Sequence, residues 1–322
     1  MREISKIINK IKPDKRLKIL SHSCHERAQV SQSKINADFY LYHNQQLKRW
    51  ESKYAPLPSN FTILPDNYIP SHVDFDLVLF QNIAGAAQTL IPIAQRFNLP
   101  IVRYEHTTCD GWPLQQRMQC KQFSGDMNIF ISEYSRKQWL FDDMPSSVLE
   151  HGIETEVFNF RDLPRENYVL SVVNDFVNRN RECGYNLWEN VTYQLPRKLL
   201  GATPGLSEPA KSVDDLVENL NKCQVFLNTS IISPIPMALL EAMSCGAIVV
   251  STATCAIPEY IEDGVNGFCS NDASTLRQRI MEILKEPEKY KELGEKARQT
   301  ILEKCSIEKY SENFEKILRS VI

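Results

Sequence analysis

One carboxylate stands alone in the most apolar stretch of this sequence. Between Cys223 and Pro258 the only charged residue is Glu241, in the segment MALLEAM. Burying a carboxylate is costly unless hydrogen-bond donors surround it. One explanation is a helix residue that turns toward water. The other is a ligand that supplies hydroxyl donors to Glu241.

The residues before Glu241 could bind phosphate. Pro236 suits the first turn of a helix, because its missing N–H would have no partner there. The amides of Met237, Ala238 and Leu239 would then be free at the positive end of the helix dipole. Glu241 would lie one turn further along the same face, where a carboxylate can accept two hydrogen bonds from a diol. Phosphate at the helix start and a diol at the next turn together describe a nucleotide.

Size and composition limit the class of protein. The 322 residues are enough for two domains of about 150 residues each. A net charge of −3 argues against nucleic acid as a partner, and no apolar run approaches the roughly 20 residues that span a bilayer. The N-terminus lacks the pattern of a signal peptide, and the nine cysteines form no C-x-x-C pair. We therefore expect reduced thiols and a cytoplasmic location.

A basic bias is confined to residues 2–18. Ile4, Ile7, Ile8 and Ile11 recur there at helical spacing among lysines and arginines. The segment is either a helix that packs its isoleucines on the domain or one that makes weak peripheral contact with an anionic membrane.

Short apolar runs alternate with helical patterns, which predicts an α/β protein with parallel sheets covered on both faces. The expected strands are 17–22, 37–42, 61–64, 76–81, 99–104, 127–132, 146–149, 168–173, 224–229 and 247–251. The expected helices are 85–97, 114–123, 133–141, 185–200, 212–222, 236–244, 273–285, 288–304 and 306–320. The pattern restarts after a polar connector that begins at residue 153, which predicts two Rossmann-like, doubly wound domains facing across a cleft.

The segment from about Val225 to Phe268 resembles the C-terminal signature of the family-four retaining glycosyltransferases, which have the GT-B fold. That signature reads roughly E-G-F-P-L-x-x-x-E-A-M-A-C-G, then an apolar strand, G-G-x-P-E and a D-G-x-N-G turn. This chain has SPIPMALLEAMSCGAIVVSTATCAIPEYIEDGVNGF. The resemblance implies transfer of a sugar from a nucleotide-sugar to an acceptor, with retention of configuration and without a metal or a cofactor. The nucleotide-sugar would be the co-substrate.

The same resemblance implies a domain plan. Residues 1–152 would bind the acceptor, which is a glycan, a lipid-linked molecule or a protein. Residues 153–304 would bind the donor. The terminal helix, within 305–322, would pack back on the N-terminal domain.

The resemblance also assigns roles to single residues. Glu241 would hold the ribose, and Met237 and Ala238 would contact the diphosphate. Glu259 matches the Glu after the second loop, although a charge beside Pro258 at a helix start would look the same. The residues matched to the loop that contacts the donor sugar and the diphosphate are Ser233, Pro234, Ile235 and Pro236.

The chain departs from the family's pattern in several places. Ser233 replaces its first Glu, and Cys255 with Ala256 replaces its pair of glycines. The basic residues that the family places after the first strand of the C-terminal domain have no clean counterpart. The nearest in the segment NDFVNRNRECG are Arg179 and Arg181, which are either diphosphate ligands or exposed loop arginines, and Asn174 at its start is a further possible contact.

His106 ends an apolar strand and is the predicted catalytic residue. It resembles the histidine that many family members point at the donor sugar, where a neutral imidazole could bond a hydroxyl. A histidine satisfied within a loop is the alternative. We expect no metal at His22, Cys24 and His25, and we interpret the DFD segment at 74–76 as a turn before a strand.

Two other functions stay open. One is a nucleotide-sugar epimerase of the same fold. The other is a non-catalytic, glycosyltransferase-like partner subunit, which would suit Ser233 and the missing basic pair. The sequence names neither the donor sugar, its base nor the acceptor.

Overall fold

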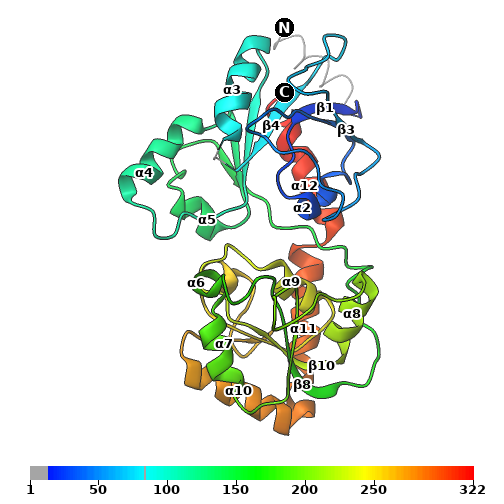
Figure 1. Cartoon of the computed structure of the whole chain (residues 1–322), viewed down its shortest axis with the longest axis vertical. Helices are drawn as coiled ribbons and strands as arrows, with labels where there is room; N and C mark the ends of the chain where they lie inside the picture. Colours follow the sequence, from blue (N-terminus) through cyan, green and yellow to red (C-terminus); the bar gives the residue numbers. More distant parts are fainter. Residues whose placement is uncertain (1–13, 83–84) are drawn as a thin grey trace. The chain divides into compact units, whose positions relative to one another are not determined.

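The computed structural model describes residues 14–82 and 85–322, and its contacts divide the chain into two units. Unit 1 comprises Met1–Gly152 with Ile307–Ile322, and unit 2 comprises Ile153–Ser306 (Figure 1). The helix expected within residues 2–18 falls almost entirely outside the described residues. In the described part of the chain, no helix is long and apolar enough to cross a membrane.

Unit 1 is built on a seven-stranded sheet in the order β3-β2-β1-β4-β5-β6-β7, and every neighbouring pair is parallel. All five residues of β4 are buried, as a continuous apolar run in a covered parallel sheet predicts. The strands are β1 (Leu17–Ser21), β2 (Ala37–Leu41), β3 (Phe61–Ile63), β4 (Leu77–Gln81), β5 (Ile101–Glu105), β6 (Met127–Phe130) and β7 (Ser146–Val148). The helices are α2 (Glu26–Gln32), α3 (Ala86–Phe97), α4 (Leu114–Gln119), η1 (Cys120–Phe123), α5 (Glu133–Gln138) and α12 (Ile307–Arg319).

The last helix, α12, belongs to unit 1 although the chain reaches it from unit 2. Its side chains Tyr310, Phe314 and Leu318 are buried, and the Phe314 ring lies 5.7 Å from the ring of Tyr104 on β5. The helix also contacts α2, so the red helix α12 lies beside the blue helix α2 in Figure 1.

An ion pair lies inside the core of unit 1. The Arg103 and Glu105 side chains on β5 are fully buried, with Nη2 of Arg103 2.9 Å from Oε2 of Glu105. The guanidinium also lies over the rings of Phe130, Trp139 and Phe141. A buried charge is tolerated only when an opposite charge pairs with it. Glu105 therefore serves as the structural partner of Arg103.

Unit 2 has a five-stranded sheet in the order β12-β11-β10-β8-β9, with every neighbouring pair parallel. Its strands are β8 (Glu166–Val172), β9 (Arg197–Leu200), β10 (Cys223–Asn228), β11 (Val249–Ser251) and β12 (Phe268–Cys269). Its helices are α6 (Asn180–Cys183), α7 (Tyr185–Thr192), α8 (Val213–Lys222), α9 (Met237–Ser244), η2 (Ile257–Glu259), α10 (Ala273–Lys285), η3 (Pro287–Tyr290) and α11 (Lys291–Lys304).

One helix expectation was wrong. A helix was expected over 185–200, but α7 ends at Thr192 and β9 begins at Arg197. Pro196 lies between them, and proline and the residue before it both resist the helical conformation.

Each sheet has one point where the strand order reverses. In unit 1 the chain runs outward from β1 to β3, then returns to β4 beside β1. In unit 2 it runs from β8 to β9, then returns to β10 beside β8. Ligands of open α/β sheets bind at the carboxyl ends of the strands at such a reversal. The β1/β4 and β8/β10 junctions are therefore the places to look for sites.

Candidate functional site

The loops after β8 and β10 meet through the short helix α6. The amides of Ile231 and Ile232 donate to the carbonyl of Glu182 at 2.8 and 3.0 Å, and Thr229 Oγ1 donates to the carbonyl of Cys183 at 3.0 Å. Gly184 follows α6 with a φ of +74°, and a Cβ there would overlap the Thr229 carbonyl oxygen. Glycine is therefore needed for the close approach of the two loops.

The loop after β11 is hydrogen-bonded to the loop after β10. The hydroxyls of Thr252 and Thr254 donate to the carbonyl of Ser230, at 2.5 and 2.6 Å. The amide of Ala256 donates to the carbonyl of Pro234 at 3.2 Å. Between them Cys255 has a φ of +50°, in the left-handed region that glycine adopts without strain. Cys255 stands where the signature has a glycine, and its backbone has the left-handed conformation that glycine adopts readily.

Helix α9 begins one residue later than expected. Pro236 is the residue before the first turn, with a φ of −70° and a ψ of 122°, and the helix runs from Met237 to Ser244. The amides of Met237 and Ala238 have no acceptor among the described residues. The expectation of a third free amide was wrong, because the Leu239 amide donates to the Pro236 carbonyl at 3.1 Å. Two amides therefore remain at the positive end of the helix.

The other end of α9 closes in a Schellman motif. Gly246 has a φ of +72°, its amide donates to the carbonyl of Met243, and the amide of Ala247 donates to the carbonyl of Ala242. These are the two bonds of that motif.

Glu241 is only 2% exposed, on the second turn of α9. The alternative of a carboxylate turned toward water is therefore wrong. The carboxylate is held within the protein, one turn beyond the two free amides.

Four of the remaining predicted donor residues lie in the loop that leads into this helix. Ile235 is buried, while Ser233, Pro234 and Pro236 are half-buried. Glu259 lies in η2, where its carbonyl accepts a hydrogen bond from the Lys304 side chain at 2.9 Å. All of these belong to the loops that follow β10 and β11.

The basic candidates lie on the other side of the β8/β10 junction. Arg179 and Arg181 are exposed at the start of α6, the helix that is bonded to the loop after β10. The side-chain oxygen of Asn174 accepts the amide of Ala202 at 2.8 Å. Asn174 therefore has a role in joining the loops after β8 and β9.

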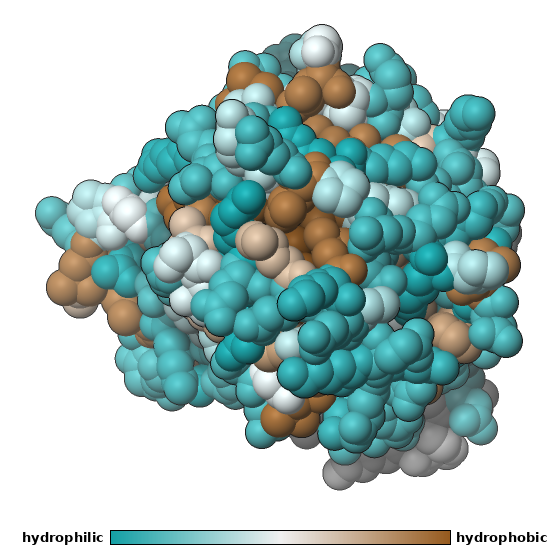
Figure 2. Space-filling view, turned by 90° about the horizontal axis from the view of Figure 1, so that it is seen from below, coloured by the Kyte–Doolittle hydropathy of each residue, from teal (hydrophilic) through white to brown (hydrophobic). Residues whose placement is uncertain are grey.

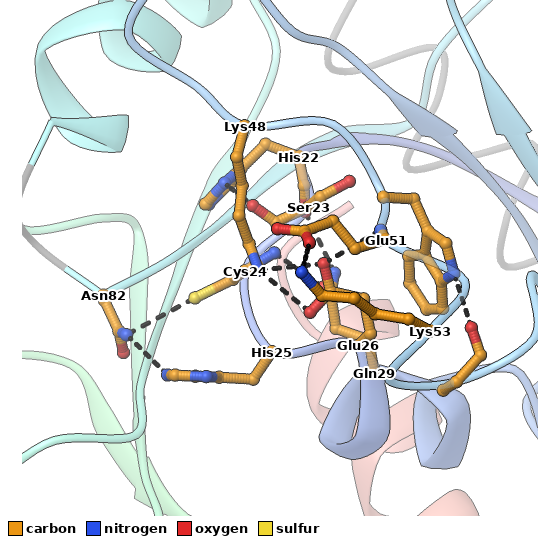
Figure 3. Close-up of polar contacts among 12 residues, drawn as sticks. His22, Ser23, Cys24, His25, Glu26, Gln29, Lys48, Glu51, Lys53 and Asn82 are labelled. Atoms are coloured by element: carbon orange, nitrogen blue, oxygen red, sulfur yellow. Dashed lines mark hydrogen bonds and ion pairs between the residues drawn. The ribbon is translucent and has the colours of Figure 1, made fainter.

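His106 lies in unit 1, at the carboxyl end of β5 beside the β1/β4 junction. The side chain of Asn82 joins three loops there. Its Nδ2 lies 3.4 Å from Cys24 Sγ and 3.3 Å from His25 Nε2 (Figure 3). Its Oδ1 accepts the His106 amide at 3.2 Å. Gln29 holds the loop after β1 on α2 by bonds to the amide of Cys24 and the carbonyl of His22. Burial lowers the pKa of His22 to about 4 and the pKa of His106 well below its usual range.

Figure 2 shows apolar side chains gathered around a hollow on the face seen from below. In unit 2 a cavity of about 500 Å³ lies at the amino ends of β10 and β11, lined in part by Phe160, Leu163 and Leu302. Arg165 and Arg298 also line it, and their guanidinium groups donate to carbonyls at the C-terminal end of α9. This cavity lies at the amino ends of the strands. It is therefore separate from the β8/β10 junction, which lies at their carboxyl ends.

Residues 209–300 match the family described as Glycosyl transferases group 1. Over 111 residues the chain is 30% identical to N-acetyl-alpha-D-glucosaminyl L-malate synthase of Bacillus anthracis, covering 34% of this chain and 29% of the relative. Over 97 residues it is 34% identical to trehalose synthase of Pyrococcus horikoshii, covering 30% and 23%. The chain thus spans less than a third of the length of these curated relatives.

Solved structures match over nearly the whole chain. Anabaena HepE in complex with UDP has a TM-score of 0.74 at 14% identity, covering 95% of this chain and 100% of HepE. Sucrose-phosphate synthase from Thermosynechococcus elongatus also has a TM-score of 0.74 at 14% identity, covering 95% and 99%. The predicted fold class, two parallel-sheet α/β domains of the GT-B type, is confirmed. The family-four identification and the replacement of the signature's first Glu by Ser233 stay predictions.

Proposed function

We propose that this protein is a glycosyltransferase that moves a sugar from a nucleotide-sugar donor to an acceptor. The observation that carries the proposal is the buried carboxylate of Glu241, one helical turn beyond two free amides at the start of α9. The match to group 1 glycosyltransferases covers this segment and supports the same conclusion.

In this proposal unit 2 binds the donor at its β8/β10 junction. The amides of Met237 and Ala238 hold the diphosphate at the positive end of α9, and Glu241 accepts hydrogen bonds from the two ribose hydroxyls. Arg179 or Arg181 supplies positive charge to the leaving diphosphate. Anabaena HepE, which shares this fold, was solved in complex with UDP, so uridine is the first base to test.

The sugar would lie against the loop of Ser233 to Pro236. Ser233 can donate or accept one hydrogen bond but brings no charge, and Glu259 is a further possible contact. His106 would present a neutral imidazole to a sugar hydroxyl. Catalysis would then consist of positioning and of stabilising the leaving diphosphate, with retention of configuration and without a metal or a protein nucleophile.

Calorimetry with UDP tests the donor site. Glu241→Gln keeps the size of the side chain but removes its charge, and we expect a 10- to 100-fold rise in Kd, or about 1.4–2.7 kcal/mol. Glu218→Gln, on the exposed face of α8, is the control and should leave Kd unchanged. Equal affinity in the wild type and in Glu241→Gln would refute the ribose assignment, provided that thermal melting shows both to be folded.

An activity screen separates the three functions. A panel of UDP-, GDP- and ADP-sugars with glycan, lipid-linked and protein acceptors should release free nucleoside diphosphate only when an acceptor is present. Interconversion of the sugar without acceptor would favour the epimerase. No binding across the panel would favour the non-catalytic partner, which Ser233 suits.

A further inference from the structure

A buried glutamine at the end of β4 stands between β1 and β5 of unit 1. Gln81 is 1% exposed and is the last residue of the strand. Its backbone amide donates to Nε2 of His22 at 3.0 Å, and its side-chain oxygen lies within hydrogen-bond distance of Nε2 of His106. The proposed function gives Gln81 no role.

The side-chain bonds of Gln81 determine where the proton of His106 lies. Gln81 Oε1 is 2.9 Å from Nε2 of Gln32, an amide nitrogen that can only donate. The same oxygen is 2.9 Å from Nε2 of His106. A carbonyl oxygen can only accept, so the ring nitrogen must carry the hydrogen. The side-chain nitrogen of Gln81 lies 3.5 Å from Gln32 Oε1, so the two side-chain amides form a reciprocal pair.

With the proton on Nε2, the other ring nitrogen of a neutral imidazole is a bare acceptor. Nδ1 of His106 is buried and has no hydrogen-bond partner among the described residues. A buried acceptor without a partner carries a desolvation cost, which a hydroxyl donor would remove.

The surroundings hold the ring in place and keep it neutral. The ring of His106 lies 4.0 Å from that of Tyr104, and the imidazoles of His25 and His151 lie 6.3 and 6.1 Å away. Burial, and then His151, His25 and His22, lower the pKa of His106. Nδ1 is therefore an acceptor across the physiological pH range.

We infer that Gln81 is the positioning residue of His106, holding it in the Nε2–H tautomer so that Nδ1 accepts a hydroxyl of the sugar substrate. This inference rests on the proposed function for the identity of the hydroxyl, but the tautomer itself is independent of it. A bare Nδ1 also specifies the group that it binds. A neutral hydroxyl can donate a hydrogen bond to Nδ1, whereas an anionic oxygen has no hydrogen to donate.

The tautomer is measured directly by ¹⁵N–¹H correlation NMR of histidine-labelled protein without substrate. We expect the wild-type His106 to show protonated Nε2 and bare Nδ1. Gln81→Leu should lose this preference, and Gln81→Glu should keep it, because a carboxylate accepts the same bond. Gln224→Leu is the matched control: it removes another buried glutamine, in unit 2, and should change nothing at His106.

Enzyme kinetics distinguishes a positioning role of Gln81 from a purely structural one. With the donor found by the screen, Gln81→Leu should lower kcat/KM at least 10-fold while the Kd for UDP stays unchanged. Gln81→Glu should recover activity and move the acidic limb of the pH profile upward, since its charge stabilises the imidazolium.

Two results would overturn the inference. One is a wild-type His106 protonated at Nδ1, and the other is an unchanged tautomer in Gln81→Leu. Failure of the proposed function is a different result: the protein would bind no nucleotide-sugar while the tautomer in the wild type and the variants followed the expected pattern.

Discussion

The glycine after α6 controls how closely that helix approaches the proposed donor loop. Gly184 has a φ of +74°, and an added Cβ would overlap the Thr229 carbonyl oxygen. Gly184→Ala must therefore move α6 away from the loop. The three hydrogen bonds from Thr229, Ile231 and Ile232 to the end of α6 would weaken or break.

Gly205→Ala is the matched control for this change. Gly205 has a φ of +77°, but an added Cβ would meet nothing within 4 Å. Both substitutions carry the cost of a left-handed alanine, about 1–2 kcal/mol. Gly184→Ala additionally loses three hydrogen bonds at about 0.5–1.5 kcal/mol each, so we expect it to destabilise by a further ~1.5–4.5 kcal/mol.

Urea denaturation followed by circular dichroism measures this difference, and calorimetry with UDP measures its effect on the site. We expect Gly184→Ala to bind UDP at least 10-fold more weakly than Gly205→Ala. If the two variants lose the same stability, the contact with Thr229 does not control the approach of the loops and the reasoning fails.

Two further predictions concern unit 1. Glu105→Ala leaves Arg103 as an unpaired buried charge, so urea denaturation should show a loss of about 3–5 kcal/mol; Glu133→Ala, which breaks an exposed pair, should lose less than about 1 kcal/mol, and equal losses would contradict the buried-pair argument. Burial lowers the pKa of both His22 and His151 from 6.5 to about 4, so the unfolded chain takes up their protons first as the pH falls. Tm should therefore fall between pH 6.5 and 4, and His151→Gln should show a smaller fall; an unchanged slope would show that His151 does not contribute.

Much of the fold could be predicted because central parallel strands are apolar on both faces. The continuous runs at β4 and β10 stand out in the sequence, and both strands are fully buried. Gly246 likewise marked the end of α9, because a left-handed residue is wanted there.

The errors fall where local pattern competes with other constraints. The strand β9 has only one buried residue of four, so its apolar signal was too weak to separate it from α7. The Leu239 amide is lost because the first turn tightens onto Pro236, which no spacing rule foresees. In the sequence Gln81 looks like the end of an apolar run, and the one signal of its role is that a single polar residue occupies that position.

The first and last residues of unit 2 lie close together, which allows the unit to be exchanged as one block. Ile153 pairs with Ser306 in a parallel bridge, and the amide of Ile153 donates to the carbonyl of Cys305 at 2.7 Å. Unit 2 is therefore an insertion whose entry and exit are neighbours, placed between Gly152 and α12. Exchanging residues 153–306 as one block with the same block of a relative keeps α12 with its own sheet and cuts neither core. Ending the chain before α12 would instead strip unit 1 of the helix that covers Tyr104.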